Sequence, residues 1–314
     1  MPATIYSVTL NPALDESLSI DSLTLGGTNR CAFNGLDPGG KGVNASRVIH
    51  RLGRPTLALG FAGGVSGAFL TSALEQEGVP HAFDLVDGFT RVNVMLYERS
   101  STNRTRIYLP GPTVTAADIG RLKSRLAMVA SGELVIFGGS LPPGSNDRTY
   151  AELMTWLRDR SARCIVDTSG DALAHALRAE PLLVKPNVEE AEELLGRRLS
   201  GEKEVIEAVL ELRARGAEYA VISRGEAGAI GAGPDGVYNV FPSSLHVTSA
   251  VGAGDSMTGG MAIALNEGMD LAQALRWGSA CGVATTMTSG TKLCDAQQVY
   301  RLLDGVRLEQ LVSS

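Results

Sequence analysis

A carboxylate stands directly after three small residues in the stretch VTSAVGAGDSMTGGM, residues 247–261. Gly252, Ala253 and Gly254 lead into an expected helix, and Asp255 falls in its first turn. Free backbone amides at such a helix start can cradle a phosphoryl group that gains charge during transfer. A carboxylate beside them can accept the proton of an attacking hydroxyl. The stretch therefore indicates phosphoryl transfer, with a purely structural helix cap at Asp255 as the alternative.

A second glycine stretch, NGLDPGGKGVNASRVIHRLG, covers residues 34–53. Gly35 to Lys41 follow the nucleotide-binding pattern G-x-x-x-x-G-K, but Gly42 replaces the Ser or Thr hydroxyl that would hold Mg²⁺. The preceding residues are polar instead of forming a buried strand. We interpret the stretch as a Pro-Gly-Gly turn before an amphipathic helix, with Asn44 in the first turn able to bind sugar hydroxyls. A helix start of structural use alone is the alternative.

A third motif, KPNVEEAEELLG, begins at Lys185 after the apolar run PLLV. Lys185, Asn187 and Glu190 would leave the carboxyl end of a strand and enter a helix. An amide and a carboxylate there could hold hydrated Mg²⁺ and nucleotide phosphates. Acidic residues also favour the first turn of any helix, which is the structural alternative.

Composition excludes several other classes of protein. The 314 residues carry a net charge of −6 without a block of Lys or Arg, so binding to nucleic acid is not expected. Four separated cysteines offer no zinc or redox spacing and are expected to be free thiols of a cytoplasmic protein. We find neither a signal peptide nor a membrane span. Met257 occupies the third glycine position of a dinucleotide motif, which argues against an oxidoreductase. A non-catalytic ligand sensor remains an alternative.

The elements that would position these residues alternate between apolar strands and amphipathic helices. This order predicts an α/β fold with a mainly parallel sheet, helices on both faces, and ligands at the carboxyl ends of the strands. Two segments, residues 16–35 and 90–109, show short alternating strands instead. We expect them to form a small β-sheet lid on a single domain of residues 1–314. The exposed edges of that lid predict a homodimer.

The three motifs together resemble the PfkB-type sugar kinases of the ribokinase superfamily. DPGGKGVNASRVIHRLG and VTSAVGAGDSMTGGMAIAL are similar to the two signatures of that family. The segments TLNPALD, TRVN, GSLPPG, DTSGDAL, KPNVEE, SRGEAGAI and GTKLC follow the same family in order along the chain. The resemblance implies a ribokinase-like three-layer sandwich and transfer of phosphate from ATP to a sugar.

The resemblance also implies roles for individual residues. Asp255 would be the general base, and the amides of Gly252, Ala253 and Gly254 would form an anion hole. The sugar hydroxyls would be held by Asp15, Gly39, Gly40 and Asn44. Mg²⁺, bound through water, and the ATP phosphates would be positioned by Asn187 and Glu190, with Lys185 nearby at the nucleotide. The ATP groove would be lined by Ser223, Gly225 and Gly228, where Arg224 replaces the usual Leu. A K⁺ site is common in the family near residues 249–251 and 286–290.

Arginines of the two lid segments indicate a substrate that already carries a phosphate, because an Arg fork binds phosphate in a bidentate way. Arg30 and Arg91 are the preferred pair, Arg106 is a further candidate, and Lys41 and Ser140 could assist. DPGGKG and TLNPALD resemble the 1-phosphofructokinase and tagatose-6-phosphate kinase branch. RIYLPGP, CIVDTSGDAL and GTKLC resemble the type-2 6-phosphofructokinases. The expected substrate is fructose 6-phosphate, with fructose 1-phosphate or tagatose 6-phosphate as alternatives.

Overall fold

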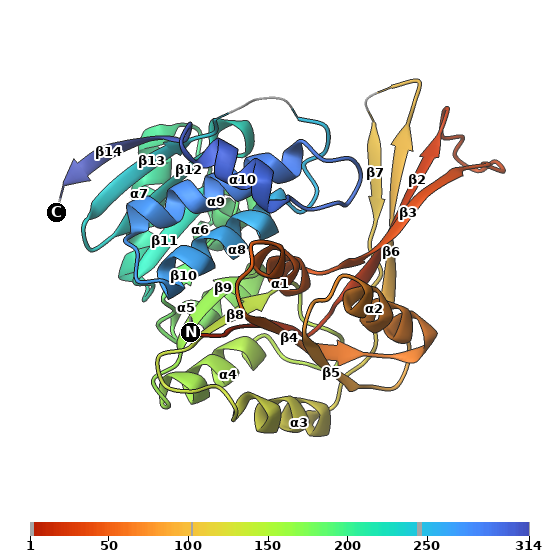
Figure 1. The fold of residues 1–314 in the computed structure, drawn as a ribbon, viewed down its shortest axis with the longest axis horizontal. Helices are drawn as coiled ribbons and strands as arrows, with labels where there is room; N and C mark the ends of the chain where they lie inside the picture. Colours follow the sequence, from red (N-terminus) through yellow and green to blue (C-terminus); the bar gives the residue numbers. More distant parts are fainter. Residues whose placement is uncertain (1–2, 102, 244–246, 314) are drawn as a thin grey trace.

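A ten-stranded sheet runs through the centre of the computed structural model, which describes residues 3–101, 103–243 and 247–313. Its strand order is β14-β13-β12-β11-β10-β9-β8-β1-β4-β5, and neighbouring strands from β11 to β5 are parallel (Figure 1). The parallel strands are β1 (Ile5–Thr9), β4 (Thr56–Ala62), β5 (His81–Leu85), β8 (Leu134–Gly138), β9 (Arg163–Asp167), β10 (Leu183–Val184) and β11 (Tyr219–Ser223). An antiparallel edge follows, made of β12 (Ala229–Gly233), β13 (Gly236–Phe241) and β14 (Arg307–Ser313).

Helices cover both faces of this sheet, because the strands carry apolar side chains on both sides. One face packs against α3 (Ala116–Leu126), α4 (Thr149–Arg158), α5 (Gly170–Leu177), α6 (Val188–Leu195) and α7 (Glu202–Ala214). The other face packs against α1 (Lys41–Arg51), α8 (Ala253–Asn266), α9 (Leu271–Thr286) and α10 (Ala296–Leu303). The three layers have two separate apolar cores, one on each side of the sheet.

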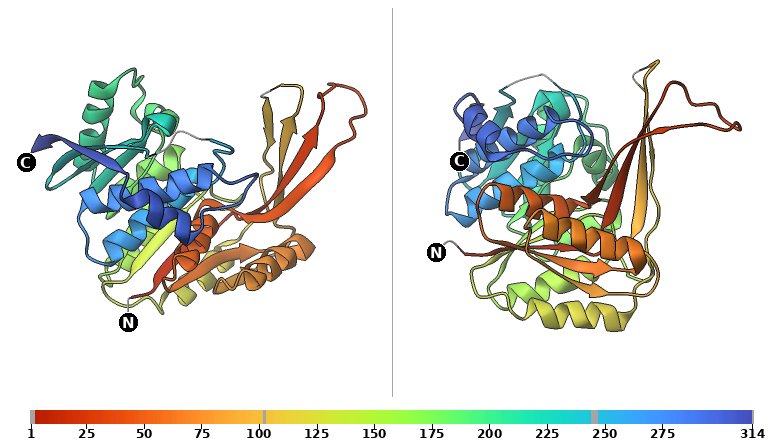
Figure 2. Two further views of the ribbon diagram at one scale, coloured as in Figure 1. Left: turned by 45° about the horizontal axis from the view of Figure 1, so that its top comes forward. Right: turned by 45° about the vertical axis from the view of Figure 1, so that its right-hand side comes forward.

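The smaller sheet has the order β3-β2-β6-β7 and stands away from the three layers (Figures 1 and 2). Its strands are β2 (Ala13–Ile20), β3 (Ala32–Gly39), β6 (Arg91–Glu98) and β7 (Arg104–Ile107). We call this sheet the lid. Its base rests on α2 (Gly64–Gln76), where Leu14 and Val43 share a small apolar cluster with side chains of α2.

The expected fold class, a mainly parallel α/β sheet with a small second sheet, is confirmed. The lid strands begin earlier than the expected first segment, at Ala13, and end later, at Gly39. Leu14 pairs with Pro38 and Ala13 with Gly39, so β2 keeps the chain extended where a Pro-Gly-Gly turn was expected. The expected turn was therefore placed two residues too early: Pro38 and Gly39 belong to β3, and the chain turns only at Gly40, with φ 113°. Within the described residues, no helix is both long enough and apolar enough to cross a bilayer.

Candidate functional site

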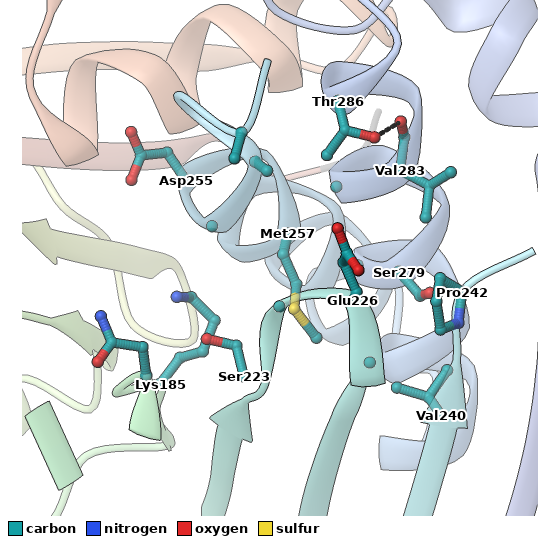
Figure 3. A pocket seen from close by; sticks show the side chains of 18 of the residues that line it. Lys185, Ser223, Glu226, Val240, Pro242, Asp255, Met257, Ser279, Val283 and Thr286 are labelled. Carbon is teal, nitrogen blue, oxygen red and sulfur yellow. Dashed lines mark hydrogen bonds between the residues drawn. The ribbon is translucent and has the colours of Figure 1, made fainter. Parts of the chain in front are cut away.

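A pocket of about 430 Å³ lies at the carboxyl ends of β9, β10 and β11, as expected for a parallel sheet (Figure 3). One end of the pocket is polar and includes Lys41, Asp167, Lys185, Asn187, Glu190 and Asp255. The other end is largely apolar and includes Val240, Pro242, Val247, Met257 and Val283. A pocket with a charged end and an apolar end suits a nucleotide, whose phosphates and base need these different surroundings.

Asp255 projects from the first turn of α8 at the polar end of the pocket. The helix starts after Gly252, whose φ of 76° suits glycine, and a Cβ there would lie 2.6 Å from Leu293. The first amides of α8 have no acceptor within the helix and are free to bind an anion. The structure therefore brings together the residues expected for the base and the anion hole, Gly252, Ala253, Gly254 and Asp255.

The Asn44 side chain joins α1 to this carboxylate. Its Nδ2 donates to Asp255 Oδ2 at 2.8 Å, while its Oδ1 accepts from Arg47 Nη1 at 3.2 Å. Arg47 is buried, also donates to the Pro38 carbonyl, and forms an ion pair with Glu77. Because Arg47 has only donors, it fixes which end of the Asn44 amide faces Asp255. Sequence reasoning missed Arg47, which lies one helical turn after Asn44.

The pKa of Asp255 is raised to about 6, chiefly by burial and also by the negative charge of Asp167. The hydrogen bond from Asn44 and the charges of Lys41 and Lys185 act in the opposite direction and lower it. A carboxylate with a pKa near 6 is mostly ionised at neutral pH and is a stronger proton acceptor than an exposed aspartate.

Three other residues expected at the sugar lie at the base of the lid. Asp15 on β2 is buried, accepts from Asn93 Nδ2 at 2.9 Å, and has its pKa raised chiefly by burial. A Cβ on Gly39 would lie only 2.1 Å from Asp15 Oδ2, so glycine is required for β3 to pass this carboxylate. Gly40 follows at the turn into α1, which carries Asn44 toward the pocket. The next helical residue, Gly42, packs so closely on β1 that a Cβ would meet Thr9 Oγ1 at 2.5 Å, which leaves no room for a P-loop hydroxyl.

A further carboxylate, Asp167 at the end of β9, was not assigned from the sequence. It accepts from Lys41 Nζ at 2.7 Å, from Lys185 Nζ at 3.0 Å and from Thr258 Oγ1 at 2.7 Å. The two ammonium groups hold its pKa below the usual range despite complete burial. The available signal was weak: an Asp at the carboxyl end of an apolar strand, inside the segment DTSGDAL.

Asn187 and Glu190 form a reciprocal cap at the start of α6, as the structural alternative allowed. Asn187 Oδ1 accepts from the Glu190 amide at 2.8 Å, and Glu190 Oε2 accepts from the Asn187 amide at 2.9 Å. Glu190 Oε1 also binds Lys41 Nζ at 2.9 Å, while both side chains still line the pocket. Among the described residues, no cluster of three acidic, His or Cys side chains could cage a metal ion. One or two side-chain oxygens facing a nucleotide pocket nevertheless suit Mg²⁺, which is commonly carried by phosphates and water.

The groove residues Ser223, Gly225 and Gly228 line the same pocket. Ser223 ends β11 beside Asn187, with which it forms an isolated parallel bridge. Arg224 turns away from the pocket and donates to Asn239 Oδ1 at 2.7 Å. The substitution that departs from the family pattern is therefore accommodated outside the groove.

The expected phosphate-binding residues of the lid differ in their surroundings. Arg91, at the start of β6, donates to the carbonyls of Asn11 and Leu109, and its Nε is buried without an acceptor. Arg30 is exposed in the β2–β3 connection and Arg106 is exposed on β7; neither side chain makes a hydrogen bond with the described residues. Ser140 follows β8 and accepts from Asn11 Nδ2 at 3.3 Å. Lys41 lies with the nucleotide-side carboxylates.

The two loops expected to hold a monovalent cation lie side by side near the start of α8. Ser249 Oγ donates to the Gly290 carbonyl at 2.8 Å, and the Ser249 amide donates to the Thr286 carbonyl at 3.1 Å. These two hydrogen bonds hold the Thr286 and Gly290 carbonyls beside Ser249.

Comparison with known proteins gives consistent matches along nearly the whole chain. Residues 9–298 match the model of the pfkB family carbohydrate kinases. The chain is 36% identical over 304 residues to ATP-dependent 6-phosphofructokinase isozyme 2 of Escherichia coli strain K12, covering 95% of this chain and 98% of that protein. It is 32% identical over 307 residues to 1-phosphofructokinase of Bacillus subtilis strain 168, covering 98% and 100%. The crystal structure of phosphofructokinase-2 from Escherichia coli in complex with potassium superposes with a TM-score of 0.92 at 34% identity, covering 96% and 98%.

Proposed function

Because the chain belongs to the pfkB family of carbohydrate kinases, we propose that it phosphorylates fructose 6-phosphate with ATP and forms fructose 1,6-bisphosphate. The observation that carries this proposal is the position of Asp255. It lies in the first turn of α8, lines the pocket, and accepts a hydrogen bond from Asn44 on α1, the helix that follows the lid strand β3. A sugar hydroxyl and a terminal phosphate would meet at this one carboxylate.

In the proposed mechanism, Asp255 accepts the proton of the attacking hydroxyl as that oxygen approaches the phosphorus of the terminal phosphate. The amides of Ala253 and Gly254 donate to the phosphoryl oxygens as charge builds on them. Asn44 and Asp15 orient the sugar through its hydroxyls. The apolar end of the pocket, which includes Val283, accommodates the base of the nucleotide.

Glu190 and Asn187 are the residues that would face Mg²⁺ through water, and the ion would neutralise charge on the ATP phosphates. The proposed K⁺ would lie between residues 249–251 and 286–290, close to the anion hole. The potassium complex of the similar Escherichia coli kinase supports this proposal.

The identity of the sugar phosphate is inferred from the relatives and from the lid arginines. The 36% match to a 6-phosphofructokinase favours fructose 6-phosphate, whereas the 32% match to a 1-phosphofructokinase keeps fructose 1-phosphate as the second candidate. Tagatose 6-phosphate is a further alternative. Arg91 is the strongest candidate for the substrate phosphate, because its buried Nε has no acceptor. Arg30 and Arg106 are exposed lid cations that could complete the grip.

A coupled assay of ADP release tests this proposal across fructose 6-phosphate, fructose 1-phosphate and tagatose 6-phosphate. We expect the highest kcat/KM with fructose 6-phosphate and no comparable ADP release without a sugar phosphate. The Asp255→Asn variant is the control and should lose about 10²-fold or more in kcat. A higher kcat/KM with another ketohexose phosphate would identify that compound as the substrate instead of fructose 6-phosphate. No ADP release with any of the three sugar phosphates would refute the kinase proposal.

We further propose a homodimer that forms through the lid. Its outer strands β3 and β7 each have an edge that no strand of the described residues pairs with, and the exposed side chains include Phe33 and Ile107, which are 65% and 51% accessible. A partner subunit would cover such edges and apolar groups. Light scattering at micromolar concentration distinguishes a dimer from a monomer. We place the protein in the cytoplasm, where ATP is abundant and four free cysteines stay reduced.

A further inference from the structure

Asp167 is the point where charged groups from the two sides of the active site meet. Its carboxylate is 1% exposed and touches one ammonium group from the start of α1 and another from the end of β10. Lys41 binds Oδ1 at 2.7 Å, and Lys185 binds Oδ2 at 3.0 Å. The hydroxyl of Thr258, one turn beyond Asp255 on α8, also donates to Oδ2. One buried side chain thus contacts α1, β10 and α8 at once.

Both ammonium groups lie where a transferring phosphoryl group would need positive charge. A Cβ built on Gly254 would lie 3.5 Å from Lys185 Nζ, which places this ammonium beside the proposed anion hole. Lys41 lines the same pocket and also binds Glu190, one of the residues proposed to face Mg²⁺. Two like charges held near one point repel each other, and the repulsion is strong where water is largely excluded. A carboxylate between them offsets that repulsion and fixes their separation.

We propose that Asp167 is a positioning residue for phosphoryl transfer, which holds Lys41 and Lys185 on two sides of the transfer point. The inference rests on the proposed kinase function. Asp167 itself is enclosed by its three partners and is not required to touch either substrate. Its removal should therefore lower turnover more than it weakens binding, because the misplaced ammonium groups would matter most as charge develops on the phosphoryl group.

The test compares Asp167→Asn with the wild type in steady-state kinetics for ATP and for the best sugar phosphate. We expect kcat to fall about 10²-fold or more, with both KM values within about threefold. The matched control is Asp84→Asn. Asp84 is likewise a buried carboxylate in an ion pair, with Arg125, but it lies on β5 at the edge of the sheet. That variant should lower Tm and leave kcat unchanged.

The pH profile separates positioning and charge from a merely structural role. The charged groups that act on Asp255 are Asp167, which raises its pKa, and Lys41 and Lys185, which lower it. Loss of the Asp167 charge should therefore move the acid limb of kcat/KM to lower pH, by about one unit. A general loss of folded protein would reduce the rate at every pH and leave the limb where it is.

Thr258→Val gives a second test if Asp167→Asn does not fold. It keeps the charge of Asp167 and removes one hydrogen bond to its carboxylate, so kcat should fall about threefold to tenfold while the acid limb stays in place. Wild-type kcat in the folded Asp167→Asn variant, or in Thr258→Val where the first variant does not fold, would overturn the inference while leaving the kinase proposal intact. A wild-type enzyme without activity on any sugar phosphate would overturn both.

Discussion

The hydrogen bond from Asn44 to Asp255 should set the pH at which the enzyme loses activity in acid. Asp255 must be ionised to accept a proton, and its pKa of about 6 places the acid limb of kcat/KM near that pH. The Asn44→Ala variant removes the donor that stabilises the ionised form. The pKa of Asp255 should then rise, and the acid limb should move to higher pH.

The size of this shift follows from the contact. A hydrogen bond to a charged group stabilises by about 1.5–3 kcal/mol, and one pKa unit corresponds to about 1.4 kcal/mol. Water can replace part of the lost bond, because Asp255 is only half-buried at the pocket wall. We therefore expect a rise of about one unit, to a pKa near 7. At pH 6 the ionised fraction would fall from about one half to about one tenth, whereas at pH 8 it would hardly change.

The assay is the ratio of kcat/KM in Asn44→Ala to that in the wild type, measured from pH 5.5 to 8.5. Titration of the substrate phosphates affects both enzymes equally and cancels in this ratio. The ratio should rise about fivefold between pH 6 and pH 8, on top of a loss at all pH values from weaker sugar binding. Ser46→Ala is the control, because Ser46 is buried on the same helix and bonds to Ser7 and Thr56 instead of Asp255. A ratio for Asn44→Ala that is constant with pH would refute the assignment of Asp255 as the base governed by this contact.

Two further predictions concern the lid and the anion hole. Arg91→Ala should raise the KM for the sugar phosphate about tenfold or more, with a smaller change in kcat. The control is Arg99→Ala, which changes another lid arginine, paired with Asp21, and should leave this KM unchanged. A KM in Arg91→Ala equal to that of the wild type would place the substrate phosphate elsewhere. Gly252→Ala should lower Tm by about 3–6 °C and also reduce kcat, because the new Cβ meets Leu293 and strains the turn before the free amides. Gly53→Ala has a similar φ of 71° but open space around the Cβ, so calorimetry and kinetics should show strain without loss of turnover.

The sequence indicated the layered fold because strand and helix periodicities alternate clearly from residue 56 onward. The antiparallel edge β12–β14 was not anticipated, because short strands such as Ala229–Gly233 contain small residues and lack a distinct alternating pattern. The end of β3 was misplaced for a different reason. Pro38 and two glycines favour a turn locally, but pairing with β2 keeps Pro38 and Gly39 extended, and no local signal reports that pairing.

For the candidate site, sequence reasoning proposed the groups that carry their own signature and did not propose those that are defined only by contact. Asp255 follows a run of small residues, and Asn44 follows a glycine turn, so each is visible within a few positions. Asp167 becomes significant only because β9 ends between Lys41 and Lys185, which are 126 and 18 positions away in the chain. Arg47 is similarly defined by the side chain that it orients.

Lys41 lies in a sequence that resembles a P-loop, and it reaches the pocket from a different kind of structure. In a P-loop the lysine reaches nucleotide phosphates from the loop that wraps around them. Here the glycines have other roles: Gly39, before Lys41, lets β3 of the lid pass Asp15, and Gly42, after Lys41, packs against β1 of the central sheet. The lysine nevertheless lines the nucleotide pocket, because α1 starts at the carboxyl ends of the strands and its first side chain reaches Asp167 and Glu190. In the proposed mechanism, this one helix start would provide both Asn44 for the sugar and the Lys41 cation for the phosphates.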